Sequence, residues 1–152
     1  MSTPITGGCQ CGAIRYRVTA PLENPHICHC RMCQKAFGNF FAALVSMKKA
    51  DLQWTKGEPS YFSSSEIVER GFCKDCGTPL TFAYDTSDKT SVSIGSLDHP
   101  DAVTPVCQYG LESRHPAFAT FHTLPGSTTE DDIPADQREH LKSLQHPDFE
   151  TG

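Results

Sequence analysis

Apolar and polar residues alternate along several segments of the chain, which is the period-two pattern of strands with one buried face. The stretch AIRYRVT, residues 13–19, alternates in this way until Pro21, Asn24 and Pro25 interrupt it. Four more segments are rich in aromatic and β-branched residues and are bounded by Gly, Pro, Asp or Ser: 40–47, 65–72, 79–84 and 90–97. The pattern predicts a mainly β fold.

One short helix is expected among these strands. The segment RMCQKAFG, residues 31–38, ends at Gly38, and glycine is the residue that most often terminates a helix. The fold should therefore combine strands with short peripheral helices.

The end of the chain differs in composition. Residues 127–152 are polar and acidic, and Pro134 is placed to begin a short helix that would carry Leu141 and Leu144. We therefore predict one folded domain over residues 1–126, followed by a polar C-terminal tail.

The overall charge narrows the range of partners. A formal net charge of -5 gives no general attraction to nucleic acid or to anionic lipid, so neither nucleic acid nor a membrane is an expected partner. The opening MSTPITGGCQCG lacks the basic head and apolar run of a secretory signal. We expect a cytoplasmic protein; the sequence does not indicate its oligomeric state.

The eight cysteines of the chain are its most informative residues for function. Seven of them fall into three short clusters: Cys9 and Cys11; Cys28, Cys30 and Cys33; Cys73 and Cys76. Disulfide partners are usually scattered along a chain, whereas the ligands of one metal ion arrive in local groups on tight turns. Because a reducing cytosol also keeps thiols free, the spacing favours metal binding over a disulfide framework.

The motif FCKDCGTPL is the most specific of the three. C-x-x-C-G at the tip of a hairpin directs both thiolates at one centre, and Gly77 can adopt the positive φ that such a turn often needs. The alternative, a redox C-x-x-C, requires a helix that begins at Cys73, which Gly77 and Pro79 disfavour. Zinc is the preferred interpretation.

The seven clustered thiols divide into four and three. Neither two-residue cluster can hold zinc alone, and together they form the four-cysteine group: Cys9, Cys11, Cys73 and Cys76. The remaining cluster is the triplet: Cys28, Cys30 and Cys33. Four protein ligands are typical of structural zinc, and three ligands with a fourth position available are typical of catalytic zinc. We therefore expect two zinc ions per chain, one structural and one catalytic.

Charge constrains the chemistry of the triplet. Zinc with three thiolates has a net charge of about -1, which makes it a weak Lewis acid that suits an incoming thiolate. A thiol bound there would add to, or leave, a small electrophilic carbon. The alternative is a second structural site completed by Cys107 or a histidine. Cys107 has no ligand-like neighbours, and His29 is poorly placed because adjacent residues rarely reach one ion.

The same motifs resemble a known family. GGCQCGAIRY, CHCRMCQKAFG, FCKDCGTPL and GSLDHPD, over about residues 6–125, are similar to the glutathione-dependent formaldehyde-activating enzymes, whose domain is shared with centromere protein V. The resemblance implies a zinc-bound, Mss4-like fold of small coiled β-sheets, with the four-cysteine group structural and the triplet catalytic. The implied reaction is the carbon–sulfur lyase or synthase chemistry that joins glutathione and formaldehyde as S-hydroxymethylglutathione.

Residues around the metals are less constrained. Family members often carry a histidine and then a tryptophan in the region where this chain has Gln108 and Phe118. Four cations flank the cysteine clusters and are candidates to bind an anionic tripeptide, although each is also interpretable as a solvated charge: Arg31, Lys35, Arg70 and Lys74. Five histidines are candidate general acids or bases, with His29 favoured by its place in the chain: His26, His29, His99, His115 and His122.

Two classes of function remain. The first is a zinc-dependent carbon–sulfur lyase that acts on a small-molecule thiol such as glutathione. The second is a non-catalytic, zinc-stabilised binding or scaffold module, in which the triplet site would be closed or absent. Neither a G-x-S-x-G elbow nor a glycine-rich phosphate loop occurs in the sequence. The triplet favours the enzyme.

Overall fold

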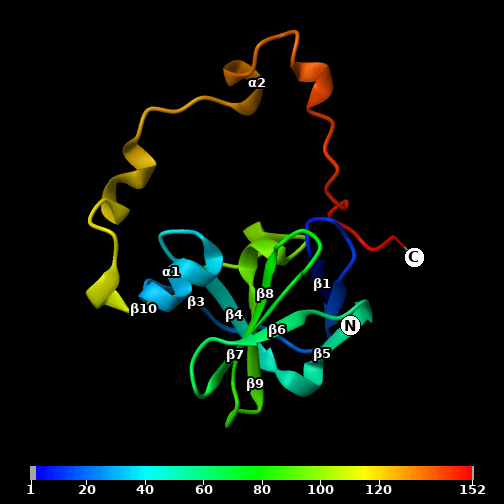
Figure 1. The fold of residues 1–152 in the computed structure, drawn as a ribbon, viewed down its shortest axis with the longest axis vertical. Helices are drawn as coiled ribbons and strands as arrows, with labels where there is room; N and C mark the ends of the chain where they lie inside the picture. Colours follow the sequence, from blue (N-terminus) through cyan, green and yellow to red (C-terminus); the bar gives the residue numbers. More distant parts are fainter. Residues whose placement is uncertain (1–2, 152) are drawn as a thin grey trace.

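A computed structural model describes residues 3–151, which form ten strands in two sheets (Figure 1). The smaller sheet has the order β1-β2-β5, with bounds Ile5–Gly8, Arg15–Val18 and Leu52–Lys56. The larger sheet has the order β10-β3-β4-β9-β8-β7-β6, with bounds Cys107–Tyr109, Glu23–Cys28, Ala42–Lys48, Lys89–Ser93, Pro79–Tyr84, Val68–Phe72 and Ser60–Ser63. The predicted mainly β class is confirmed.

Each of the five predicted strand segments overlaps a strand, and the segment 79–84 matches β8 at both ends. The strand predicted over residues 13–19 ends before Pro21, as β2 does at Val18, but Asn24 and Pro25 lie within a further strand, β3, which the sequence pattern did not predict. The strand accommodates them through a register shift against β4 between Glu23 and His26 and a positive φ of 45° at Asn24. Such an irregularity allows a proline to lie in a strand without losing the rest of the ladder.

The predicted helix is present as α1, Arg31–Phe37. Its N-cap is Cys30, whose sulfur accepts a hydrogen bond from the backbone N–H of Cys33, and Gly38 ends it in the left-handed conformation at φ 57°. The other helical segments are short: α2 Thr129–Asp132 and the 3-10 turns Lys49–Asp51, Ile94–Ser96, Pro100–Ala102, Leu111–Ser113, Phe118–Thr123 and Arg138–His140. The cysteine triplet thus begins the main α-helix of the described chain.

The larger sheet is packed on both faces. Along β4, Val45 and Met47 belong to the main hydrophobic core, whereas Ala42 and Leu44 belong to a second cluster with Cys33. Successive residues of a strand face opposite sides of the sheet, so the two clusters lie on opposite faces. The main core also takes in large apolar residues of the smaller sheet and of β8 and β9: Tyr16, Val18, Leu80 and Val92.

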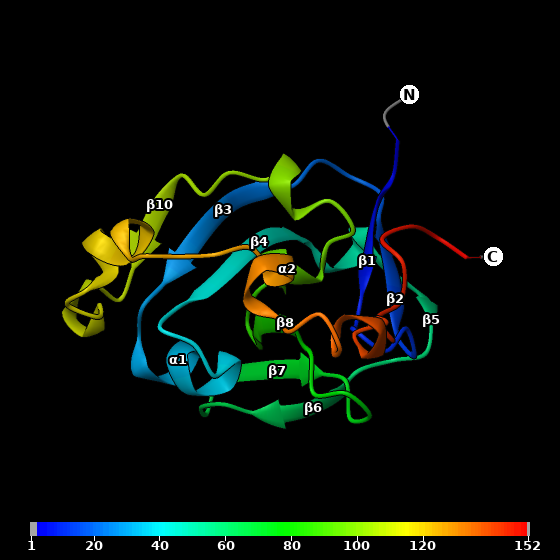
Figure 2. The same ribbon diagram turned by 90° about the horizontal axis from the view of Figure 1, so that it is seen from above.

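Beyond β10 the chain leaves the sheets as an arch through α2 and returns beside β1 (Figures 1 and 2). The helix expected to carry Leu141 and Leu144 is reduced to a 3-10 turn at Arg138–His140, and both leucines are exposed. A short helix without a packed apolar face gains little stability. The domain boundary at residue 126 remains a prediction. Across residues 3–151, no helix has the length and apolar content needed to cross a membrane.

Candidate metal centres and active site

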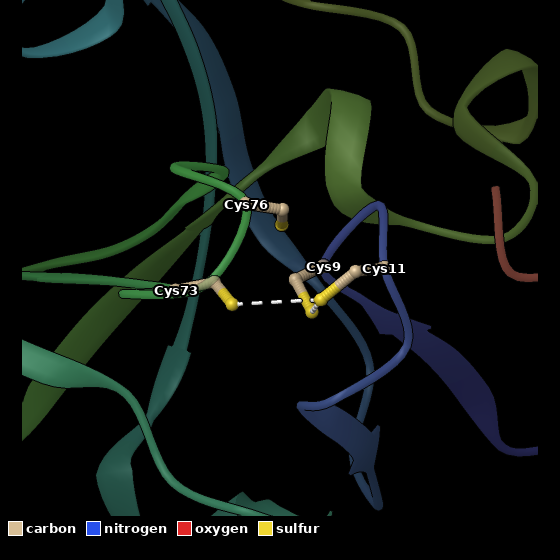
Figure 3. Close-up of side chains that lie close together, drawn as sticks. All are labelled: Cys9, Cys11, Cys73 and Cys76. Atoms are coloured by element: carbon tan, nitrogen blue, oxygen red, sulfur yellow. Dashed lines mark hydrogen bonds between the residues drawn. The ribbon is translucent and has the colours of Figure 1, made fainter. Parts of the chain in front are cut away.

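The two halves of the four-cysteine group come from turns far apart in the sequence. Cys9 and Cys11 lie on the turn between β1 and β2, and Cys73 and Cys76 lie on the turn between β7 and β8 (Figure 3). All four sulfurs lie within 4.8 Å of one another. The Sγ atoms of Cys9 and Cys11 are 3.6 Å apart, and those of Cys11 and Cys73 are 3.8 Å apart.

These distances fit a tetrahedral zinc site. Zn–S bonds of about 2.3 Å at tetrahedral angles separate two ligand sulfurs by roughly 3.8 Å. Thiolates are also the donors that zinc prefers over harder cations. The four-cysteine group could therefore hold one metal ion, and it would join the β1–β2 turn to the β7–β8 turn.

The turn that carries Cys73 and Cys76 has the predicted hairpin geometry. Gly77 has a φ of 82°, and its N–H donates to the carbonyl oxygen of Cys73 at 2.8 Å. The N–H of Cys73 donates to the carbonyl oxygen of Thr78 at 3.0 Å. β7 and β8 are antiparallel on either side, so the helix required by the redox interpretation is absent from this described segment.

Local surroundings make the four thiols unequal. Burial raises the pKa of Cys9 to about 12, although the N–H of Ile14 donates to its sulfur at 3.3 Å. For Cys76, burial raises the pKa, but hydrogen bonds from Thr78 outweigh it and lower the value to about 6. A bound cation would favour the thiolate at every position.

The triplet is assembled by the end of β3 and the start of α1. Cys28 ends the strand, Cys30 caps the helix, and Cys33 lies in its first turn. Their three sulfurs lie within 4.8 Å of one another. In residues 3–151, no histidine, cysteine or carboxylate joins this group as a fourth member. Cys107 lies on β10 instead, where its thiol donates to Oδ1 of Asn24 at 3.2 Å.

Two of the triplet thiols, Cys28 and Cys33, also differ in pKa. The hydrogen bond with Cys28 lowers the pKa of Cys33 to about 5, with a further contribution from Arg70, against burial that raises it. The same Cys28–Cys33 hydrogen bond, together with burial, raises the pKa of Cys28. Of these two thiols, Cys33 is therefore the more acidic.

A cavity of about 300 Å³ reaches two of the triplet cysteines, Cys28 and Cys33. Alternate residues of β3 line it and continue to the triplet: Asn24, His26 and Cys28. On the neighbouring strands, Ser46 is in register with Ser91, and their hydroxyls are 2.9 Å apart at the cavity wall. Strand register therefore places several polar groups in a largely apolar cavity on the face of the sheet that also carries the triplet.

Among the five candidate histidines, His26 lines this cavity. Its Nδ1 is 2.7 Å from the backbone carbonyl oxygen of Asn24. A carbonyl only accepts hydrogen bonds, so Nδ1 carries the proton and a neutral imidazole keeps its Nε2 lone pair. Among the other candidates, His99 lines a separate cavity of about 680 Å³, and His115 and His122 lie along the 111–123 segment.

The choice of His29 as the favoured acid or base is not supported. His29 is fully buried, and its Nε2 is 2.9 Å from Oε1 of Gln108. Its ring packs edge-on against Phe41 and Phe118. His29 follows the last residue of β3 and is not among the residues that line the cavity that Cys28 reaches. Gln108 and Phe118, which stand where the family resemblance implies a histidine and a tryptophan, are both neighbours of this histidine.

The candidate cations fall into two kinds. Arg31, Lys35 and Lys74 are exposed; Arg31 bonds to Gln34 in its own helix, and Lys74 pairs with Asp75 at 3.5 Å. These three side chains therefore fit the second interpretation given for them from the sequence, that of solvated surface charges. Arg70 does not: it is 3% exposed, and its Nη2 donates to the sulfur of Cys33 at 3.4 Å. No local sequence pattern indicates this contact, because it depends on how α1 packs against β7.

Two curated proteins are similar to this chain over about half of its length. The chain is 39% identical over 80 residues to an uncharacterised lyase of Schizosaccharomyces pombe, covering 51% of this chain and 56% of that protein. It is 33% identical over 84 residues to a Halomonas elongata protein assigned as a glutathione-dependent formaldehyde-activating enzyme, covering 50% of this chain and 54% of that protein. The chain thus matches about half the length of these curated relatives.

A crystal structure of a Rhodobacter sphaeroides protein has the same fold, with a TM-score of 0.56 at 20% sequence identity, covering 68% of this chain and 98% of that one. The model of the glutathione-dependent formaldehyde-activating enzyme family matches residues 4–112, a span that contains the triplet and both halves of the four-cysteine group. The chain therefore belongs to the glutathione-dependent formaldehyde-activating enzyme family.

Proposed function

We propose that this protein is a zinc-dependent carbon–sulfur lyase or synthase that interconverts glutathione plus formaldehyde with S-hydroxymethylglutathione. The observation that carries the proposal is the difference between the two cysteine groups. Four sulfurs converge in one group, whereas three converge in the other beside a cavity of about 300 Å³. Membership of the family supplies the named thiol and aldehyde.

The four-cysteine group would hold the structural ion. Cys9 and Cys73 are buried in the main core, and their turns belong to different sheets. An ion there would cross-link the two sheets and contribute directly to the free energy of folding.

The triplet would hold the second zinc, through Cys28, Cys30 and Cys33. Zinc bound there would stabilise the thiolate form of an incoming thiol at neutral pH. In the reaction, the thiol sulfur attacks the carbonyl carbon, an S–C bond forms as the C=O π bond breaks, and the thiol proton ends on the aldehyde oxygen. Cleavage is the reverse.

The cavity would orient the reactants and move the proton. Its volume is at the lower end of the range for ligand sites, so it suits formaldehyde and the thiol end of the tripeptide. The Nε2 lone pair of His26 is positioned to take the thiol proton and return it to the alkoxide oxygen. The hydroxyls of Ser46 and Ser91 offer donors for that oxygen.

The proposal includes a cytoplasmic location. All eight cysteines are free thiols in the structure, a state that the reducing cytoplasm maintains.

NMR exchange spectroscopy with ¹³C-formaldehyde and glutathione tests the reaction. Zinc-loaded wild type should exchange free and thiol-bound formaldehyde faster than buffer alone. The matched control is the Cys28→Ser, Cys30→Ser variant, which should return the rate to the uncatalysed value. It leaves Cys33 in place, and serine is itself a favoured helix N-cap at position 30. A wild-type rate no higher than the uncatalysed one would refute the proposed reaction and favour a binding module.

A further inference from the structure

Arg70 occupies a buried position on the cavity side of the larger sheet. It lies on β7 in register with Phe82 of β8, and its guanidinium carbon is 4.9 Å from the centroid of the Phe82 ring. Nε donates to the hydroxyl of Ser64 at 2.9 Å, and Nη2 donates to the sulfur of Cys33 at 3.4 Å. These contacts fix the guanidinium plane against the triplet.

This guanidinium has no carboxylate partner. In residues 3–151, no aspartate or glutamate oxygen lies within 4.0 Å of it, and its Nη1 is buried without a hydrogen-bond partner. Arg15, a second buried arginine, differs from Arg70 in having a carboxylate partner. Arg15 is also buried, at 5% exposed, but it forms a paired hydrogen bond with Asp98. An isolated charge in a protein interior is strongly destabilising, so a buried arginine needs a negative neighbour.

The triplet is the negative neighbour within reach. Three thiolates around a divalent ion carry a net charge of about -1, which Arg70 offsets. A substrate thiolate would bring the group to about -2, and in a partly buried site the repulsion between like charges is poorly screened. With Arg70 included, the charge after thiolate binding is about -1.

We propose that Arg70 is a positioning residue that offsets the charge of the triplet and thereby allows an anionic sulfur to bind beside it. The inference rests on the proposed function, because it assumes that the fourth position receives a thiolate. It adds a selectivity that the cysteines alone do not supply. Without Arg70 the same site should favour a neutral ligand over an anionic one.

The test compares anionic and neutral ligands on the full chain loaded with Co²⁺. Glutathione is the anionic probe and imidazole the neutral one, and both are followed by the cobalt absorption bands. Arg70→Met removes the charge and should lower the affinity for glutathione by about tenfold or more relative to that for imidazole. Arg70→Lys keeps the charge but loses the planar fork, so it should restore most of that ratio.

Two further variants separate charge from structure. Arg70→Gln keeps hydrogen-bond donors without charge and should behave as Arg70→Met, which provides a second test if the methionine variant does not fold. Lys35→Met, on the exposed face of α1, changes the net charge of the protein by the same amount and should leave the ratio unchanged. A purely structural role for Arg70 would weaken both ligands equally.

An unchanged ratio in both uncharged variants would overturn the inference, and so would a wild-type protein that binds imidazole but no thiol. These outcomes are distinct from failure of the proposed reaction. If the ratio falls as expected but glutathione and formaldehyde do not turn over, Arg70 keeps its role and the reaction assignment is wrong.

Discussion

Arg15 and Asp98 form a buried, two-armed ion pair between segments 83 residues apart. Nη1 and Nη2 of the arginine lie 2.9 Å and 2.5 Å from the two carboxylate oxygens. Thr6 donates a further hydrogen bond to Oδ2 of Asp98. The pair joins GGCQCGAIRY to GSLDHPD, two of the motifs that carry the family resemblance. Because Arg15 follows the turn that carries Cys9 and Cys11, we assign Asp98 a structural role near the four-cysteine group.

Asp98→Asn should destabilise the protein by about 3 kcal/mol, because it leaves the charge of Arg15 buried with one carboxylate fewer. Chemical denaturation at pH 7 measures the change. The control is Glu23→Gln, which breaks the exposed pair with Lys89 and should have a much smaller effect. Equal effects of the two substitutions would contradict the structural role of the buried pair.

The same pair predicts a pH dependence. Burial raises the pKa of Asp98, but the hydrogen bonds from Arg15 and Thr6 outweigh burial and hold it below its usual value. The stabilisation should therefore be complete above the unfolded-state pKa of about 3.9 and be lost as pH falls through the lower folded-state value. Unfolding curves at pH 2 to 7 should show an acid-side loss of stability that Asp98→Asn reduces; an identical loss in both proteins would exclude this origin.

Metal removal should unfold the domain through the four-cysteine group. Structural zinc contributes on the order of 10 kcal/mol, comparable with the whole stability of a small domain. Cys73→Ser should therefore lose most of the cooperative thermal transition, followed by circular dichroism. Cys107→Ser, which alters a thiol outside both groups, should melt like wild type. A folded Cys73→Ser protein with an unchanged transition would show that the ion is dispensable for the fold.

Gly110 approaches the backbone of the triplet closely. A Cβ atom at this position would lie 2.6 Å from the nitrogen of Cys30, and the residue has a φ of 67°. Gly110→Ala should therefore displace the triplet turn and weaken metal binding there, with the four-cysteine group unaffected. The matched control is Gly38→Ala, which has a φ of 57° but open space around its Cβ, and should cost only about 1 kcal/mol of stability. Metal titration distinguishes them, and equal metal affinity in both variants would contradict the packing argument.

The end of the chain packs against the turn that carries Cys9 and Cys11. The N–H of His146 donates to the carbonyl oxygen of Gln10 at 2.8 Å, and Glu150 lies 3.2 Å from Arg15. Ending the chain after Leu144 should therefore lower the melting temperature and accelerate zinc loss to a chelator. Leu144→Ser, which changes a side chain that is 92% exposed, should change neither. Equal melting temperatures for the truncated and full chains would show that these contacts add no stability.

Spacing along the chain was sufficient to predict which cysteines cluster, because each ligand pair is local and its turn can be recognised from glycine and strand neighbours. The same holds for α1, whose boundary at Gly38 is a local feature. Contacts between strands were not predictable in this way. The approach of Arg70 to Cys33, the burial of His29 and the place of His26 in the cavity all depend on register and packing across the larger sheet.

β3 is one of the five strands that the pattern did not predict, the others being β1, β5, β6 and β10, and long-range pairing explains its formation. Asn24 and Pro25 are turn residues by local preference, and the pairing of the flanking residues Glu23 and His26 with β4 continues the strand past them. Long-range pairing also brings Gln108 against His29. The sequence therefore specifies the metal-binding groups more clearly than the cavity beside them.

Metal content per chain tests the central claim, which is that the chain holds two zinc ions at separate groups with different roles. Wild type purified without chelator should contain about two zinc ions per chain, and the Cys28→Ser, Cys30→Ser variant about one, with an unchanged circular dichroism spectrum and thermal transition. About one zinc ion in both proteins would contradict the claim, because the triplet would then not be a resident metal site.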